Sequence, residues 1–262
     1  MPLGSRVGAM MIRLGKLFVG LWLYGTAMVA ILRAGLGNMP WDVLHQGLAE
    51  KMGLSVGVVS IIVGALVLLL WVPIRQKPGF GTVANVIVIG VAFDTMAPLF
   101  PENPALVVAI PMMLGGIVLN AFATVLYIGA GMGPGPRDGL MTGLVARTGG
   151  SVRVVRTSME VLVVIAGFLL GGTLGIGTVL YAVGVGPLIQ LFARTGLGGP
   201  ALARGGDAHG ARTPDGDARG PVGDGPRPDG VARVGECGSS SPEPAPVSAK
   251  AWLGRMRSAA RT

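Results

Sequence analysis

The sequence predicts an all-α membrane protein with about six transmembrane helices, arranged as two inverted repeats of three spans each. Three observations lead to this fold class. The 262 residues are 51% apolar and only 13% charged, with a mean hydropathy of +0.64, whereas soluble domains carry roughly 25% charged residues. Uncharged stretches that approach the roughly 20 residues needed to cross a bilayer recur along the chain. A glycine-proline motif around Gly37 returns around Gly133, 96 residues later.

The repeated motif reads Gly-x-Gly-x-x-Pro-x-Asp and occupies residues 35–42 and 131–138. The same offset of 96 residues matches glycines, serines and threonines well beyond the motif, for example Gly79 and Gly175. We therefore interpret residues from about 15 to 195 as a duplicated unit. Each copy is expected to carry one short extra helix after its first span.

The first repeat is assigned to residues 12–100. Residues 17–32 carry no charge and, with their flanks, are long enough to make the first span. The short helix follows Pro40, places apolar residues four apart and ends at Gly53. It is too short to span, so it either lies at the membrane interface or dips in as a half-helix. The second and third spans are expected at 56–74 and 80–100.

The second repeat is assigned to residues 104–196 and follows the same order. Its first span lies in an uncharged stretch from Ala105, where Pro111 either kinks the helix or delays its start. The second short helix follows Pro136. The remaining two spans are expected at 152–171 and 176–193.

The two ends of the chain differ from the spans in composition. Residues 1–11 are polar to mildly basic and are expected to be an unstructured cytoplasmic segment. Residues 197–248 are rich in Gly, Pro and Arg and contain too little apolar surface to fold, so we expect a disordered tail. Residues 249–262 either form a short basic amphipathic helix on the membrane surface or remain a solvated chain end. Three methionines compete as the translation start: Met1, Met10 and Met11.

The placement of charge favours one orientation in the membrane, because Lys and Arg are retained on the cytoplasmic side. With six crossings, the basic residues near both termini and those of a central loop fall on one side. We therefore expect a multi-pass protein of the cell membrane with both termini in the cytoplasm. The net charge of +8 reflects this retention, and few aromatic residues interleave with the arginines, so nucleic acid is not an expected partner. The arginines of the central loop are Arg137, Arg147, Arg153 and Arg156.

Asp42 and Asp138 follow Pro40 and Pro136 near the start of each short helix. The structural interpretation is that each carboxylate caps free N–H groups and meets the positive end of the helix dipole. The functional interpretation is that glycine-rich breaks at membrane depth persist where they line a cavity. One break per repeat marks the substrate path of inverted-repeat transporters. The candidates that the two motifs supply are Gly37, Pro40, Asp42, Gly133, Pro136, Arg137 and Asp138.

Glu160 lies near the middle of the fifth predicted span, where an ionisable residue is costly and is therefore a functional candidate. It either forms a structural ion pair with Arg156 or Arg153, or stays neutral and carries a proton. Asn85 and Asp94, in the third predicted span, complete the candidates for the substrate path. Their simpler interpretations are interhelical hydrogen bonding for Asn85 and interfacial solvation for Asp94.

Catalysis and cofactor binding are not expected. Cys237 is the only cysteine, and His45 and His209 are the only histidines, so cysteine-based and histidine-based metal clusters are excluded. No nucleophile–base pair appears in the spans, and Gly79 and Gly175 lack the following lysine of a phosphate-binding loop. The prediction is no enzyme, no catalytic residue, no metal and no cofactor. Three tryptophans are assigned to anchoring at the membrane interface: Trp22, Trp41 and Trp71.

A run of Arg-Ala-Gly-Leu-Gly at 33–37 is followed by Pro-Trp-Asp at 40–42, and later by Gly-x-Gly-Thr at 79–82 with Asn85. This pattern resembles the YczE/YitT-like family of bacterial multi-pass membrane proteins over roughly residues 12–195. The second copy departs from the pattern, because an arginine takes the place of the tryptophan. The resemblance implies a location in the bacterial inner membrane and a multi-pass topology, and it transfers no catalytic residue.

Together these features favour a small-solute transporter or permease built from inverted repeats. The rival hypothesis is a non-transporting membrane protein that docks or regulates a cytoplasmic partner through its arginine-rich inner loop and tail. The expected partners are the lipid bilayer and a small solute, and a second copy of the chain is left open. Deletion of residues 198–262 separates the hypotheses, because it should spare a transporter and cripple a docking protein.

Overall fold

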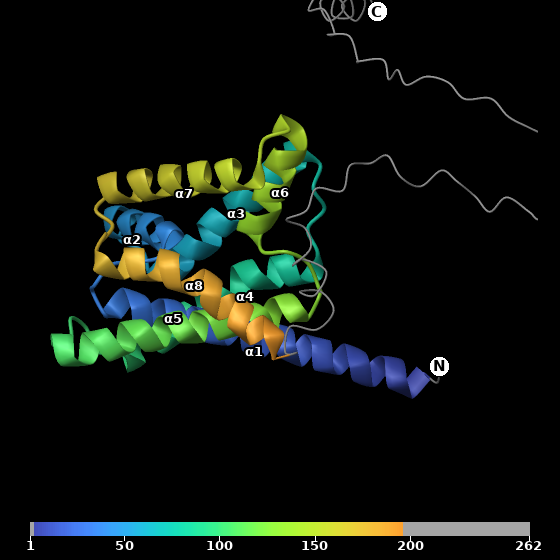
Figure 1. Ribbon diagram of the computed structural model, residues 1–262, viewed down its shortest axis with the longest axis horizontal. Coiled ribbons are helices and arrows are strands. Elements are labelled where there is room, and N and C mark those ends of the chain that lie inside the picture. The colour runs from blue at the N-terminus through green and yellow to red at the C-terminus, as the bar shows by residue number, and fades with distance from the viewer. Residues whose placement is uncertain (1–2, 196–262) are drawn as a thin grey trace, which may run out of the picture. The chain divides into compact units, whose positions relative to one another are not determined.

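The computed structural model describes the backbone of residues 3–195 and the side chains of residues 7–195 (Figure 1). This range is helical throughout, apart from turns and short loops. The helices, in chain order, are α1 (Leu3–Arg33), α2 (Pro40–Met52), α3 (Val56–Ile74), α4 (Phe80–Met96), the 3-10 helix η1 (Ala97–Leu99), α5 (Leu106–Gly129), α6 (Pro136–Thr148), α7 (Val152–Leu169) and α8 (Ile176–Arg194).

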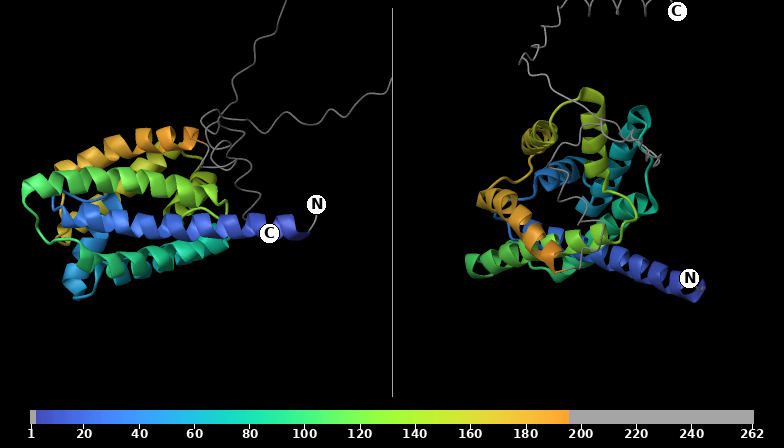
Figure 2. Two further views of the ribbon diagram at one scale, coloured as in Figure 1. Left: turned by 90° about the horizontal axis from the view of Figure 1, so that it is seen from below. Right: turned by 45° about the vertical axis from the view of Figure 1, so that its right-hand side comes forward.

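The helices form two groups that face each other. In the first group, α1 packs along α5, with α4 on the outer side of α1 and α8 on the outer side of α5, as the left view of Figure 2 shows. The second group contains both short helices, with α2 packed against α7 and α3, and α6 packed against α3 and α7. Along one side, α3 also packs against α4 and so joins the two groups.

The central pair, α1 and α5, runs antiparallel and in close contact. Near the start of α1, Arg13 donates through Nε to the carbonyl oxygen of Ala130 at the end of α5, at 2.8 Å. A Cβ on Gly20 would lie 2.8 Å from the backbone nitrogen of Tyr127, and one on Gly116 would meet α1 in the same way. The expectation that small residues in the spans permit close helix packing is therefore confirmed at this pair.

Each short helix is bounded by the local chemistry that the sequence contains. Both begin with proline at the first helical position, where the missing N–H costs nothing and the fixed φ suits a helix. Both end at a left-handed glycine, Gly53 with φ 65° and Gly149 with φ 66°. Ser55 and Ser151 then accept from the backbone N–H three residues on and start α3 and α7. The predicted short helices are confirmed.

The breaks before the short helices are held by backbone contacts between the two halves of the chain. Gly81 donates its N–H to the carbonyl oxygen of Met132 at 2.9 Å, and Gly177 donates to Leu36 at 2.8 Å. Both bonds join the start of a long helix in one half to the break in the other half, and their donors are 96 residues apart. At the N-termini of α4 and α8, the hydroxyls of Thr82 and Thr178 accept a hydrogen bond from the backbone N–H of the N-cap glycine three residues earlier.

Five of the described helices are long and apolar enough to cross a membrane. The segment α7 has 18 residues but carries three charged side chains, Arg153, Arg156 and Glu160, so the sixth span remains a prediction. The five segments are Val7–Arg33, Val56–Ile74, Phe80–Leu99, Leu106–Gly129 and Ile176–Arg194.

Two expectations about helix ends are wrong. The N-terminal segment 1–11 is not unstructured, because α1 already begins at Leu3; no proline interrupts the chain after that point, so the helix extends upstream from the span. Pro111 does not delay the start of α5, which begins five residues earlier at Leu106. The predicted tail 197–248 and the predicted basic helix 249–262 lie outside the described residues.

Candidate functional site

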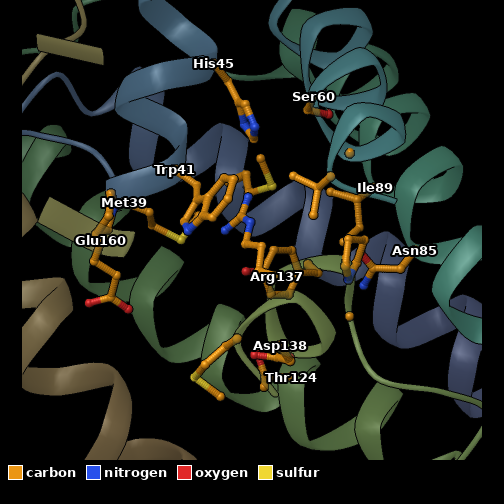
Figure 3. A pocket seen from close by; sticks show the side chains of 18 of the residues that line it. Met39, Trp41, His45, Ser60, Asn85, Ile89, Thr124, Arg137, Asp138 and Glu160 are labelled. Carbon is orange, nitrogen blue, oxygen red and sulfur yellow. The ribbon is translucent and has the colours of Figure 1, made fainter. Parts of the chain in front are cut away.

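A cavity of about 340 Å³ lies between the two helix groups and is lined by residues from all eight α-helices of the described region (Figure 3). The starts of both short helices reach it. Pro40 and Trp41 come from α2, and Pro136, Arg137 and Asp138 come from α6. The glycine-rich breaks of the two repeats, far apart in sequence, therefore meet at one site, with the positive ends of two helix dipoles directed toward it.

Arg137 links the two breaks across the cavity. The carbon at the centre of its guanidinium group lies 4.9 Å from the ring centroid of Trp41, within the range of a cation–π contact. Its Nη2 lies 3.8 Å from Oδ1 of Asp42. Trp41 and Arg137 occupy the same position in the two copies of the motif, so the replacement of the tryptophan by an arginine in the second copy produces this contact.

Asp42 is buried, with 1% of its surface exposed, and it does not cap its helix. The N-cap residue of α2 is Met39, and the helix has no side-chain cap. The Oδ1 atom of Asp42 instead lies 3.2 Å from Nδ1 of His45, which lines the cavity. The capping prediction is therefore wrong for Asp42, because the carboxylate faces a histidine and an arginine rather than free backbone N–H groups.

The remaining charges of the cavity come from α6 and α7. Glu160 and Arg156 both line it and pair with each other, with Nε to Oε1 at 3.1 Å. This outcome is the structural ion pair that the sequence allowed, placed in the cavity wall. Asp138 lines the cavity with an exposed side chain, and within residues 7–195 its carboxylate takes part in no ion pair. Figure 3 shows Arg137, Asp138 and Glu160 around the same space.

The chain has three tyrosines, and all three line this cavity. The rings of Tyr24 and Tyr127 meet edge to face with centroids 6.0 Å apart. The hydroxyl of Tyr181 donates to Oδ1 of Asn120 at 3.0 Å, which joins α8 to α5. The sequence alone does not single out these residues, because each lies on a different long helix. The signal that could have found them is the scarcity of tyrosine itself.

The other predicted site residues have three different positions. Asn85 lines the cavity from α4. Gly37 and Gly133 are not among the lining residues; they have φ values of 120° and 127° and contact the starts of α8 and α4. Asp94 lies away from the cavity, where it accepts from the Ser55 hydroxyl at 2.6 Å and from a backbone N–H of α3 at 3.0 Å. Asp94 therefore joins α3 to α4, rather than being solvated at an interface.

Two of the tryptophans assigned to interface anchoring are interior residues. Trp71 is 1% exposed and donates its indole N–H to the carbonyl oxygen of Pro136 at 3.1 Å. Trp41 is 9% exposed under Arg137. The anchoring prediction is wrong for both, because helix α6 and its arginine cover them. Across the described residues, no cluster of three or more His, Cys, Asp or Glu side chains is arranged to hold a metal ion.

The walls of the cavity differ between the two halves of the chain. On one side, the lining residues of α3 and α4 are mostly buried, including Val63, Val67 and Val86. On the other side, the lining residues of α7 and α8 are exposed or half-buried, including Glu160 and Ala182. The cavity is therefore closed where α3 meets α4 and open between α7 and α8.

A bundle of long apolar helices around a partly polar cavity, where two short helices begin, is typical of a multi-span helical membrane protein. The family model described as "Family of unknown function (DUF6198)" matches residues 11–194. The chain belongs to this family, and it is a membrane protein.

Curated relatives agree with this assignment. The chain is 41% identical over 162 residues to an uncharacterized protein of Haemophilus influenzae, which covers 62% of this chain and 74% of that protein. It is 36% identical over 156 residues to the uncharacterized membrane protein YczE of Bacillus subtilis, covering 59% and 73%. It is also 23% identical over 178 residues to the uncharacterized protein YyaS of the same organism, covering 66% and 89%. No solved structure matches the chain. The resemblance to a YczE-like family is confirmed.

Proposed function

We propose that this protein is a small-solute transporter whose substrate binds in the cavity where α2 and α6 begin. The observation that carries the proposal is the convergence of both breaks on one cavity, with Arg137 of the second half in contact with Trp41 of the first. In transporters with inverted repeats, solute sites lie at the repeat interface and are formed by discontinuous helices. Irregular backbone at membrane depth is tolerated where it lines such a cavity.

The proposal includes two three-span repeats of opposite orientation and both termini in the cytoplasm. Three features support it: the antiparallel course of α1 and α5, the hydrogen bonds exchanged between the halves at Gly81 and Gly177, and the distribution of Lys and Arg.

Blocking the cavity tests the proposal directly. Ala182 lines the cavity and is exposed, so the substitution Ala182→Trp adds bulk to the site without displacing packed atoms. The neighbouring Val183 is 70% exposed and does not line the cavity, so Val183→Trp is the matched control. We expect proteoliposomes with the parent chain or the control to take up a solute from a mixed pool of metabolites, and those with Ala182→Trp to take up none. Equal uptake by both variants would contradict the proposal.

The orientation of the repeats is tested with single cysteines at equivalent positions. Leu54 follows α2 and Gly150 follows α6, and both have accessible surface. In a Cys237→Ser background, a membrane-impermeant thiol reagent should label cysteine at 54 only from outside intact cells. Cysteine at 150 should react only in inside-out vesicles. Labelling of both positions from the same face would overturn the inverted arrangement.

The arginines of the central loop support the docking hypothesis less well than the cavity supports the transporter hypothesis. Arg137 contacts Trp41 inside the cavity, Arg156 pairs with Glu160, and Arg147 donates to the carbonyl oxygen of Pro73. Each of these three side chains has a partner within the protein, although Arg147 and Arg156 are exposed. If deletion of residues 198–262 abolished the cellular role of the protein while vesicle uptake persisted, docking would gain support as a second function.

A further inference from the structure

We propose that the solute bound in this cavity is a small organic cation, an amine or a guanidinium compound, with Asp138 as its counter-ion. The inference rests on the proposed function for the use of the cavity as a solute path, and it specifies the chemical class of the solute. Three features of the cavity support it: the pairing of charges, the aromatic side chains in its walls and the relation between the two copies of the motif.

The charges that line the cavity are satisfied within the protein, with one exception. Arg156 and Glu160 pair with each other at 3.1 Å. The guanidinium of Arg137 lies over Trp41 and beside the carboxylate of Asp42. Asp138 is the cavity carboxylate that has no ion-pair partner between residues 7 and 195, although it is exposed to the cavity. A cationic group of a solute would supply the missing charge.

The aromatic content of the cavity also favours a cation. All three tyrosines of the chain, together with Trp41, line it. Aromatic ring faces attract ammonium and guanidinium groups, and the attraction strengthens where water is excluded. Figure 3 shows that Trp41 and Arg137 already form such a contact inside this space. The cavity therefore holds one cation of the chain in the kind of environment that we propose for the solute.

The repeat relation indicates where the solute cation would lie. In one direction, Asp42 of the first half faces Arg137 of the second half. If the two halves are exchanged, Asp138 takes the place of Asp42, and Trp41 takes the place of Arg137. Asp42 therefore has an arginine opposite it, whereas the position that corresponds to this arginine for Asp138 holds a tryptophan. A solute amine at this second position would complete the arrangement.

An anionic solute is the main alternative, because two helix N-termini are directed toward the cavity. Each terminus, however, already has a carboxylate at its third helical position, Asp42 in α2 and Asp138 in α6. These carboxylates offset the positive ends of the dipoles. An anion would also lie close to Asp138 and Glu160, and the two arginines that line the cavity, Arg137 and Arg156, are already paired with carboxylates of the chain.

Binding to the purified full-length chain in detergent tests the inference without requiring transport. Three probes share a benzene ring and nearly the same size but differ in charge: benzylammonium, benzyl alcohol and benzoate. We expect calorimetric titration to show that benzylammonium binds at least about tenfold more tightly than the other two, since tenfold corresponds to about 1.4 kcal/mol. Equal or tighter binding of benzoate would overturn the inference, as would the absence of benzylammonium binding at millimolar concentration.

Variants identify the counter-ion. Asp138→Asn should weaken benzylammonium binding by about tenfold or more, and Asp138→Glu should restore part of it. Glu102→Gln is the matched control, because it removes the same charge from an exposed side chain that pairs with Arg33 away from the cavity. Tyr127→Leu should weaken binding more than Tyr127→Phe, which keeps the ring face. Unchanged binding in Asp138→Asn, in protein that elutes like the parent, would contradict the assigned role.

The outcomes separate this inference from the proposed function. Asp138-dependent binding of benzylammonium without uptake of any solute into vesicles would support the cation site and contradict the transporter. Uptake of an anionic solute that Ala182→Trp abolishes, without benzylammonium binding, would support the transporter and overturn the cation site.

Discussion

The contact between α3 and α4 and the region between α7 and α8 are related by the same offset of 96 residues, but they differ in packing. In the first half, a Cβ added to Gly57 would overlap the carbonyl oxygen of Gly90, and one added to Gly64 would lie 3.0 Å from Val86. In the second half, α7 and α8 do not pack along each other. Gly186, the equivalent of Gly90, has no atom within 4 Å of an added Cβ.

The residues at the equivalent positions explain the difference. Arg153 and Glu160 on α7 correspond to Gly57 and Gly64 on α3, and side chains of this size prevent the close backbone approach that two glycines permit. Gln190 on α8 stands where Asp94 stands on α4. Asp94 ties its helix to the start of α3 through two hydrogen bonds. One pattern of helices and turns can therefore make a closed wall or an open wall, depending on a few interface side chains.

The largest expected loss of stability follows from disturbing the close contact between α3 and α4. Gly57→Ala should destabilise the protein by about 3 kcal/mol, because the new methyl group would overlap backbone atoms of α4. Gly186→Ala, at the equivalent position of Gly90 in the open wall, should leave stability unchanged or slightly raised. Thermal unfolding in detergent measures both. Similar losses for the two variants would show that the open wall is packed in solution.

The second prediction concerns a feature that the halves share. Gly37→Ala and Gly133→Ala should each cost about 1–3 kcal/mol. The φ values are 120° and 127°, and a Cβ would lie 2.7 Å and 2.8 Å from atoms of the other half. The same unfolding measurement should give similar losses for the two variants. A loss of stability in only one of the two variants would show that the two breaks are alike in sequence but not in their contribution to stability.

The third prediction uses equivalent positions in the closed and open walls. Val86 and Ala182 both line the cavity, but Val86 is 8% exposed and Ala182 is exposed. In a Cys237→Ser background, cysteine at 182 should react with a small polar thiol reagent about tenfold faster than cysteine at 86, as judged by mass spectrometry; in free energy this is about 1.4 kcal/mol. Equal rates would show that both walls open on the timescale of labelling.

The smallest effect on stability is expected at Glu160. Its pair with Arg156 joins side chains that are 41% and 64% exposed, and exposed pairs one helical turn apart contribute about 0.3–0.5 kcal/mol. Glu160→Gln should therefore alter the unfolding temperature little. Solute flux in vesicles is the informative measurement. A large loss of flux with unchanged stability would favour proton carriage, whereas unchanged flux would make Glu160 structural.

Much of the local structure could be predicted from the sequence. The short helices begin at Pro40 and Pro136 and end before Gly53 and Gly149, as proline and glycine chemistry requires. The candidate site was partly predicted, since the two breaks do meet. Trp41 was misassigned, because a tryptophan in an apolar sequence fits an interface and an interior equally well until its neighbours are known.

What the sequence alone determined is the set of apolar helices, the two breaks and the family, because each depends on composition or on residues adjacent in the chain. Only the tertiary structure decided that Tyr24, Tyr127 and Tyr181 line one cavity and that Arg137 crosses to Trp41 and Asp42. It also decided that one wall is closed and the other open. The physical reason is that these contacts join helices from different halves of the chain, and their geometry depends on how closely neighbouring helices can approach.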